Sequence, residues 1–349
     1  MSLTDYKLLL LNVNRTGWHS GNMIYDMEVI KKTCDTVVYG PGWPNYQNND
    51  IGEIIKQVYG SDAPDMIYSY FTPNEAVGSV YMDHYNIPRH LNVFPTNMDI
   101  LSKEYSNVKR IFVVSDFWAR SPEKWRNDMK GTDFQYCFSC FTPPLSSESD
   151  FFSFLKPEFM SDPLYVPLAR CVDKECFKDY ELEKEHDIIT LGSMCNFYSF
   201  RKFMHSTLSS WSPQNNVKYK NYPHCGTNFS HSGFVREEYA KAINKAKILA
   251  SCGGRYHLPF NKIFEAWGCK TMYLGEKPHG ESFLNMVDGY NYVAVTREDF
   301  VDKVEYYLAN PNEIEEIAKN GYNTFLEFHH LDARANDMAM MLTDLMEGL

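Results

Sequence analysis

Two charged residues stand three positions apart in the segment "GGRYHLPFNKIFEAWGCKTMYLGE", residues 253–276. Pro259 suits the first turn of a helix and Gly268 suits its end, so the segment predicts a glycine turn, a short helix and a strand. Lys262 and Glu265 then share one face of the helix. There the lysine and the helix N-terminus would bind an anion, and the carboxylate could accept hydrogen bonds from both hydroxyls of a ribose. The pattern favours a nucleoside-diphosphate site, with an exposed ion pair as the alternative.

A second segment, "DIITLGSMCNFYSFRKFM" at residues 187–204, predicts a strand, a turn and a helix. The backbone N–H groups of Gly192 and Ser193 can cradle an anion, and Arg201 can bind a phosphate through two parallel hydrogen bonds. A basic surface turn is the alternative interpretation, and it suits Lys202 better than Arg201.

These segments belong to a chain in which short apolar runs alternate with amphipathic stretches, the pattern of parallel sheets with helices on both faces. We expect an α/β fold with two Rossmann-like domains that face each other across a cleft, and a closing helix. The predicted boundaries are 1–171 for the N-terminal domain, 172–186 for a charged linker, 187–330 for the nucleotide-binding domain and 331–349 for the helix. Strands are expected at 7–13, 35–40, 65–71, 108–116, 134–141, 162–169, 187–193, 217–222, 247–252, 270–276 and 290–295, and helices at 23–32, 51–60, 200–211, 236–246, 297–309 and 312–326.

Composition limits the class of protein. The 349 residues carry a net charge of −11, which argues against a protein that simply coats nucleic acid. No apolar run reaches the ~18–20 residues of a membrane span, so we expect a cytoplasmic protein, or one of the host cytoplasm if its source is viral. Nine cysteines are scattered along the chain, and the lone pair Cys137 and Cys140 has no second pair at ligand spacing, so we predict reduced core thiols and no metal site.

Several segments of residues 162–340 resemble the C-terminal half of GT-B glycosyltransferases, nearest to the spore-maturation (CgeB-like) and group 1 families. The family block "P-x-R/K-x-F-E-A-x-A-C-G" corresponds to "PFNKIFEAWGCK", with Trp267 in place of a small residue and the Cys-Gly order inverted. The resemblance implies a nucleotide-sugar donor, expected to be a UDP-sugar, and no cofactor. It implies Lys262 on the diphosphate and Glu265 on the ribose. Gly192, Ser193 and Arg201 would lie near the phosphates. The chain contains no Asp-x-Asp tripeptide, so a metal-chelating GT-A design is not indicated.

The N-terminal half should then carry the acceptor site and the catalytic base. The loop "NVNRTGWHSGN" (12–22) follows the first strand, and its Gly17, Arg15 and His19 could reach over the cleft to the donor. Asp116 follows the apolar strand "IFVVS", where active-site groups of parallel sheets gather. A T4-type phage DNA β-glucosyltransferase has an aspartate base after a similar strand, which suggests Asp116 by analogy. A helix N-cap is the alternative role of Asp116, and His19 is the second candidate base.

Three alternatives stay open. The same fold could serve a nucleotide-sugar epimerase or phosphorylase, although no signal marks further acid–base groups or a pyridoxal phosphate lysine. It could also serve a nucleotide-sugar-binding module without catalysis. The acceptor of a transferase could be a saccharide, a lipid, a protein or a modified base of phage DNA, and the acidic balance disfavours DNA.

Overall fold

The structure is a computed structural model that describes residues 2–14, 22–47, 50–70, 95–114, 134–140, 164–223 and 234–348. The chain forms two compact units. Unit 1 comprises Met1–Gly17, Met27–Leu168 and Ala335–Leu349, and unit 2 comprises Trp18–Asp26 and Ala169–Arg334. Each unit is built on its own parallel sheet.

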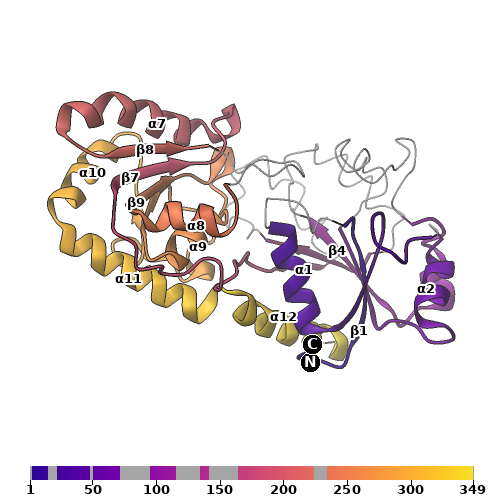
Figure 1. Ribbon diagram of the computed structural model, residues 1–349. Helices are drawn as coiled ribbons and strands as arrows, with labels where there is room; N and C mark the ends of the chain where they lie inside the picture. Colours follow the sequence, from indigo (N-terminus) through magenta and orange to yellow (C-terminus); the bar gives the residue numbers. More distant parts are fainter. Residues whose placement is uncertain are drawn as a thin grey trace. The chain divides into compact units, whose positions relative to one another are not determined.

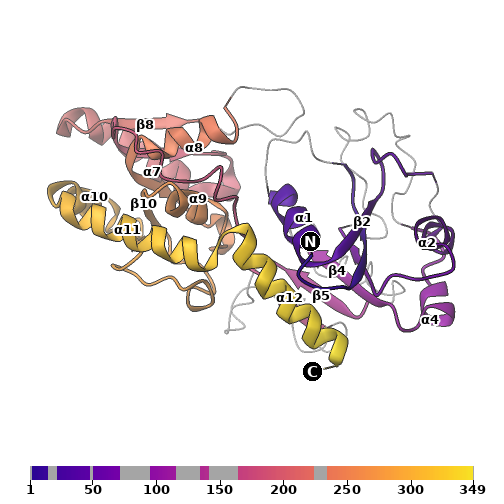
Figure 2. The same cartoon turned by 60° about the horizontal axis from the view of Figure 1, so that its bottom comes forward.

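The sheet of unit 1 has the strand order β2-β1-β3-β4-β5-β6, and all of its pairs are parallel. Its strands are β1 (Lys7–Leu11), β2 (Asp35–Tyr39), β3 (Met66–Ser69), β4 (Lys109–Val114), β5 (Tyr136–Ser139) and β6 (Leu164–Pro167). Helices are α1 (Asn22–Thr33), α2 (Ile51–Tyr59) and α4 (Ile100–Glu104). Figures 1 and 2 show α1 on one side of this sheet and α2 on the other. Because both faces are covered, the interior strand β1 is apolar after Lys7, and Leu8–Leu11 are all buried.

The sheet of unit 2 has the order β11-β10-β9-β7-β8, again with parallel pairs throughout. Its strands are β7 (His186–Leu191), β8 (Tyr219–Tyr222), β9 (Ala246–Ser251), β10 (Met272–Gly275) and β11 (Val293–Ala294). Its helices are α7 (Ser199–Trp211), α8 (Glu237–Asn244), α9 (Lys262–Gly268), α10 (Phe300–Ala309) and α11 (Pro311–Phe328). The chain closes with α12 (Leu331–Glu347), whose residues from Ala335 onward belong to unit 1.

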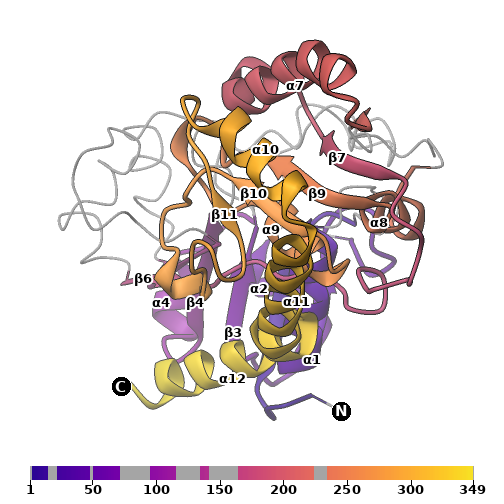
Figure 3. The same ribbon diagram turned by 90° about the vertical axis from the view of Figure 1, so that its left-hand side faces the viewer.

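Alternate residues of the second sheet enter two separate cores, as the two-residue repeat of a strand requires. Ile188 and Ile248 pack in the core that α7 and α10 complete. Ile189 and Leu249 pack in the opposite core with α8 and α9. Figure 3 shows α7 on one side of this sheet and α8 and α9 on the other. The predicted α/β class with two parallel sheets is confirmed.

The residues expected to form a linker pack within unit 2. Val172 and Phe177 are buried in the core that contains α9, and Val172 forms a bridge with His330. In the described part of the chain, no helix is both long and apolar enough to cross a membrane.

Candidate functional site

The order of the second sheet creates a switch point between β7 and β9. From β7 the chain continues to β8 on one side, and it then returns to β9 on the other, so the two loops that follow β7 and β9 diverge. In open parallel sheets, ligands bind outside the carboxyl ends of strands at such a point. The segments that carry Gly192 and Ser193 follow β7, and those that carry Cys252 and Gly253 follow β9.

Gly192 lies between the two basic residues predicted from the sequence. Its φ is +105°, a conformation that side chains rarely adopt. A Cβ at this position would lie 3.1 Å from Arg201 Nη1 and 3.5 Å from Lys262 Cε. The glycine therefore permits the close approach, and the structure brings Gly192, Arg201 and Lys262 together.

Arg201 connects the two diverging loops. Its Nη1 donates to Ser193 O at 3.0 Å, and its Nη2 donates to Ser251 Oγ at 3.2 Å and to Cys252 O at 3.4 Å. The guanidinium lies 4.3 Å from the ring centroid of Tyr198, and the residue is only 3% exposed. Nε is buried and has no hydrogen-bond partner. The charge is thus held at the switch point, and most of its N–H groups are engaged with the protein.

Lys262 and Glu265 form a pair on α9, as their spacing predicts. Lys262 Nζ lies 2.9 Å from Glu265 Oε2, and the same oxygen accepts a hydrogen bond from Tyr239 Oη at 3.1 Å. The ammonium also lies 5.0 Å from the centroid of the Tyr239 ring. Among the described residues, Glu265 Oε1 has no hydrogen-bond partner. The two oxygens of the carboxylate therefore differ: within the described part of the chain, one is held by two protein partners and the other by none.

The exposure of this pair differs from that of a surface ion pair. The side chains of Lys262 and Glu265 are 19% and 9% exposed, respectively. A carboxylate at this depth needs an opposite charge, which the lysine supplies, and the tyrosine hydroxyl adds a hydrogen bond. The apolar face of α9 fixes the geometry, since Ile263, Phe264 and Trp267 are buried in the core as expected.

Sequence reasoning missed several polar residues near these elements. Tyr239 lies on α8 and carries no sequence signal for its contact with Glu265. Asn261, just before α9, is 4% exposed, and both of its side-chain amide atoms are buried without a partner. Glu276 directly follows β10, and burial raises the pKa of its carboxyl group. Its position as the last residue of the expected strand 270–276 was the signal that could have identified it.

The remaining candidates lie outside the described residues: Arg15, Gly17, His19 and Asp116. Within the described ranges, no group of three or more His, Cys, Asp or Glu side chains could hold a metal ion.

Comparisons with known proteins relate part of this sequence to a described family. Residues 198–340, which include α7 and α9, match the sequence profile of the family described as "Glycosyl transferase-like". This part of the chain is therefore similar to glycosyltransferases, and the whole chain has the two-domain GT-B fold of the solved structures below. The recognition of this family from the motif around Lys262 and Glu265 is confirmed. A search of the curated proteins finds no significant match to this sequence.

Solved structures share the fold of this chain at low sequence identity. Anabaena HepE, crystallised in complex with UDP-glucose, is 11% identical with a TM-score of 0.61, covering 97% of this chain and 100% of HepE. Sucrose-phosphate synthase from Thermosynechococcus elongatus is 11% identical with a TM-score of 0.59, covering 99% and 100% of the two chains. A glycosyltransferase from Rickettsia africae is also 11% identical, with a TM-score of 0.57 and coverage of 98% and 99%. The likeness to phage DNA β-glucosyltransferase stays a hypothesis.

Proposed function

We propose that unit 2 binds a nucleoside-diphosphate sugar, expected to be a UDP-sugar, and that the enzyme transfers the sugar to an acceptor hydroxyl. The observation that carries the proposal is the meeting of Gly192, Arg201, Lys262 and Glu265 beside the β7/β9 switch point. The fold shared with HepE, whose crystal structure contains UDP-glucose, supports this donor class.

Glu265 is proposed to bind the ribose. Its Oε2 is held by Lys262 and Tyr239, so the carboxylate cannot rotate freely. Oε1 has no partner among the described residues and is proposed to accept the hydrogen bonds of the ligand. A fixed carboxylate oxygen can accept hydrogen bonds from ribose hydroxyls, and hydrogen bonds to a charged group contribute ~1.5–3 kcal/mol each.

Lys262 is proposed to contact the diphosphate. One N–H group of its ammonium is directed to Glu265, and an ammonium has two more to donate. Gly192 has no side chain beside this amine, which leaves room for a phosphate to approach the backbone of the loop after β7. As the donor bond breaks, charge develops on the leaving diphosphate, and a positioned cation stabilises it.

Arg201 is proposed to act mainly through position and charge. Its Nη atoms donate three hydrogen bonds to the loops after β7 and β9, so only one N–H group of Nη1 and that of the buried Nε have no partner among the described residues. The positive charge still acts on a diphosphate at the switch point, because a buried charge is poorly screened. The backbone N–H group of Ser193, in the loop after β7, is proposed to donate to the same diphosphate.

The proposed base remains Asp116, with His19 as the second candidate, and Arg15 and Gly17 are proposed to lie near the donor. The acceptor could be a saccharide, a lipid, a protein or a DNA base. The net charge of −11 disfavours DNA. The described cysteines are free thiols, which supports the proposal of a reducing, cytoplasmic setting.

Thermal unfolding in the presence of candidate donors tests this function. UDP, UDP-glucose, UDP-N-acetylglucosamine, GDP and ADP are compared at equal concentration, with uridine as the ligand that lacks phosphates. A ligand at a hundred times its Kd stabilises the fold by ~2.7 kcal/mol, which gives a clear increase in Tm. We expect UDP and its sugars to stabilise most. If no nucleoside diphosphate raised the Tm above the effect of its nucleoside, the proposed donor site would be wrong.

A further inference from the structure

A pocket lies at the amino ends of the strands of the unit 2 sheet, whereas the proposed donor site lies at their carboxyl ends. Its volume is about 420 Å³, within the ~300–1,000 Å³ typical of small-molecule sites. Lys184 lies two residues before β7, Lys247 is the second residue of β9, and Lys270 lies two residues before β10. Because β7, β9 and β10 are parallel neighbours, their amino ends, and with them these three lysines, lie on the same side of the sheet. A six-residue strand spans ~20 Å, which separates this pocket from Gly192.

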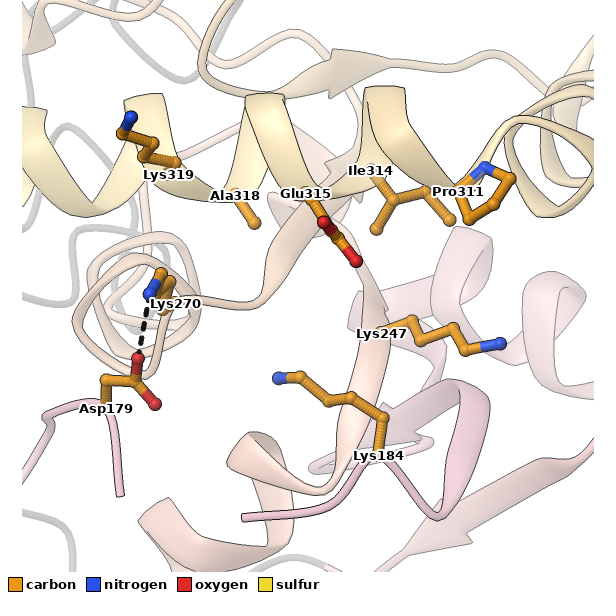
Figure 4. A pocket seen from close by; sticks show the side chains of 9 residues that line it. All are labelled: Asp179, Lys184, Lys247, Lys270, Pro311, Ile314, Glu315, Ala318 and Lys319. Atoms are coloured by element: carbon orange, nitrogen blue, oxygen red, sulfur yellow. Dashed lines mark hydrogen bonds and ion pairs between the residues drawn. The ribbon is translucent and has the colours of Figure 1, made fainter. Parts of the chain in front are cut away.

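Figure 4 shows how the pocket is lined. The helix α11 supplies one wall, where Pro311, Ile314 and Ala318 form an apolar strip. The other lining side chains are charged, two of them also on α11: Asp179, Lys184, Lys247, Lys270, Glu315 and Lys319. Lysines therefore outnumber carboxylates four to two in the lining of a pocket on a protein whose net charge is −11.

Two of the four lysines have a carboxylate partner. Lys270 Nζ lies 3.0 Å from Asp179 Oδ2, and Lys247 Nζ lies 2.7 Å from Asp187 Oδ1. Within the described residues, Lys184 and Lys319 form no ion pair, so their charges are not neutralised by a direct contact. Glu315 and Asp179 reduce the positive potential of the pocket but leave it with an excess of cations.

Lys184 is the central cation of this pocket. Its Nζ donates to Asn244 O at 2.7 Å and to Thr271 Oγ1 at 3.4 Å, both in fully buried residues. In Figure 4 its amine points into the pocket, toward the Lys270–Asp179 pair. Burial, and repulsion from Lys270, lower the pKa of Lys184 to about 8, although attraction to Asp179 opposes this. An uncompensated ammonium with uncharged partners is stabilised by any anion that enters the pocket.

We propose that this pocket binds a small phosphate-bearing molecule, with its phosphate against Lys184 and Lys270, its apolar part against α11, and Lys319 adding positive charge at the rim. A dianionic phosphate suits several neighbouring ammonium groups better than a single carboxylate, because it carries nearly two charges at pH 7. The inference goes beyond the proposed donor site and does not depend on it.

Lysine-resolved NMR tests the proposal on the whole protein. Reductive ¹³C-methylation keeps each lysine charged and gives each amine its own signal, and the signal absent from the Lys184→Gln variant identifies Lys184. The probes are inorganic phosphate and pyrophosphate, with sodium chloride at equal ionic strength as the blank. We expect a saturable shift of the Lys184 signal and a rise of its pKa by at least about half a unit. The Lys262 signal reports the donor site separately, so binding at one site is distinguished from binding at the other.

Matched variants complete the test. Lys184→Gln keeps a donor for Asn244 O but removes the charge, and Lys319→Gln removes an exposed charge with little risk to folding. We expect each to weaken phosphate binding, Lys184→Gln by about tenfold or more. Lys220→Gln, an exposed lysine of β8 outside the pocket, should bind as the parent protein does. The proposal is overturned if phosphate moves the Lys184 signal no more than chloride does, or if the two pocket variants bind phosphate like Lys220→Gln.

Discussion

Lys262 Nζ lies 2.9 Å from Glu265 Oε2, so the cation proposed for the diphosphate neutralises the carboxylate proposed for the ribose. Tyr239 donates to the same oxygen, which fixes the carboxylate from a second direction. The two charged residues are therefore coupled, and removing either leaves its buried partner uncompensated. Substitutions at the two positions should still differ in which part of a nucleotide they affect.

Glu265→Gln should weaken the binding of UDP and of uridine alike, because the ribose is present in both. The loss of a hydrogen bond to a charged acceptor is expected to cost ~1.5–3 kcal/mol. Isothermal titration calorimetry measures both affinities. Glu238→Gln, on the exposed face of α8, is the matched control and should bind normally. An unchanged affinity in Glu265→Gln would exclude the ribose role.

Lys262→Ala should weaken UDP binding more than uridine binding, since its partner is the diphosphate. The variant also leaves Glu265 with only Tyr239 as a partner among the described residues, and we expect a loss of ~1–3 kcal/mol in the free energy of unfolding. Calorimetry with UDP and uridine, alongside urea unfolding, separates the two effects. Equal losses for the nucleoside and the diphosphate would remove Lys262 from the phosphate site.

The fold was largely predictable from the sequence, because each strand of a doubly covered parallel sheet is a short apolar run. "KLLLL" at β1 and "KILAS" at β9 show this pattern, and glycines or polar residues follow such strands. The i,i+3 spacing also predicted the Lys262–Glu265 pair, since it depends on local helix geometry alone.

The partners supplied by distant segments were not predictable. Arg201 was expected to bind phosphate directly, but its contacts with Ser251 and Cys252 arise only when β9 pairs with β7. Tyr239 reaches Glu265 from another helix, and nothing in the spacing of its own segment indicates this. Such contacts depend on strand order, which periodicity does not determine.

Gly192→Ala should destabilise the protein and disturb the site. A side chain at φ +105° is strained by ~1–3 kcal/mol, and the new Cβ would press against Arg201 Nη1 at 3.1 Å. Gly289→Ala is the control, since Gly289 has φ +74° and a Cβ added there would meet nothing within 4 Å. Urea unfolding should show a larger loss for Gly192→Ala, together with weaker UDP binding. If both variants bound UDP like the parent, the loop after β7 would have no part in the donor site.

Asp116→Asn tests the proposed base two residues after the end of β4. If Asp116 accepts the proton of the acceptor hydroxyl, transfer should fall by ~10²–10⁴-fold while donor affinity is retained. If it caps a helix instead, asparagine replaces it well, and both activity and stability should persist. Transfer rates and UDP affinity measured on the same preparation separate the roles. Normal transfer would make His19 the next candidate.

His329 provides a pH-dependent contribution to stability from the buried core that packs against α9. It is 1% exposed and stacks on Phe264, with ring centroids 4.5 Å apart. Its Nε2 lies 2.8 Å from Leu284 O, and its Nδ1 lies 3.1 Å from Arg334 Nη2. The carbonyl oxygen requires a proton on Nε2 and the guanidinium requires a lone pair on Nδ1. The imidazole is therefore neutral in the folded protein.

Burial and the Arg334 charge lower the pKa of His329 to about 3, well below its ordinary value of 6.5. As the pH falls below 6.5, the unfolded state takes up a proton that the folded state excludes, so stability is lost by up to ~1.4 kcal/mol per pH unit. His329→Gln can keep one donor and one acceptor but cannot titrate. Urea unfolding between about pH 6.5 and 5 should show a shallower loss in this variant than in the parent, although the variant is less stable at pH 7. Parallel profiles for the two proteins would show that His329 is protonated in the folded state or does not contribute to acid destabilisation.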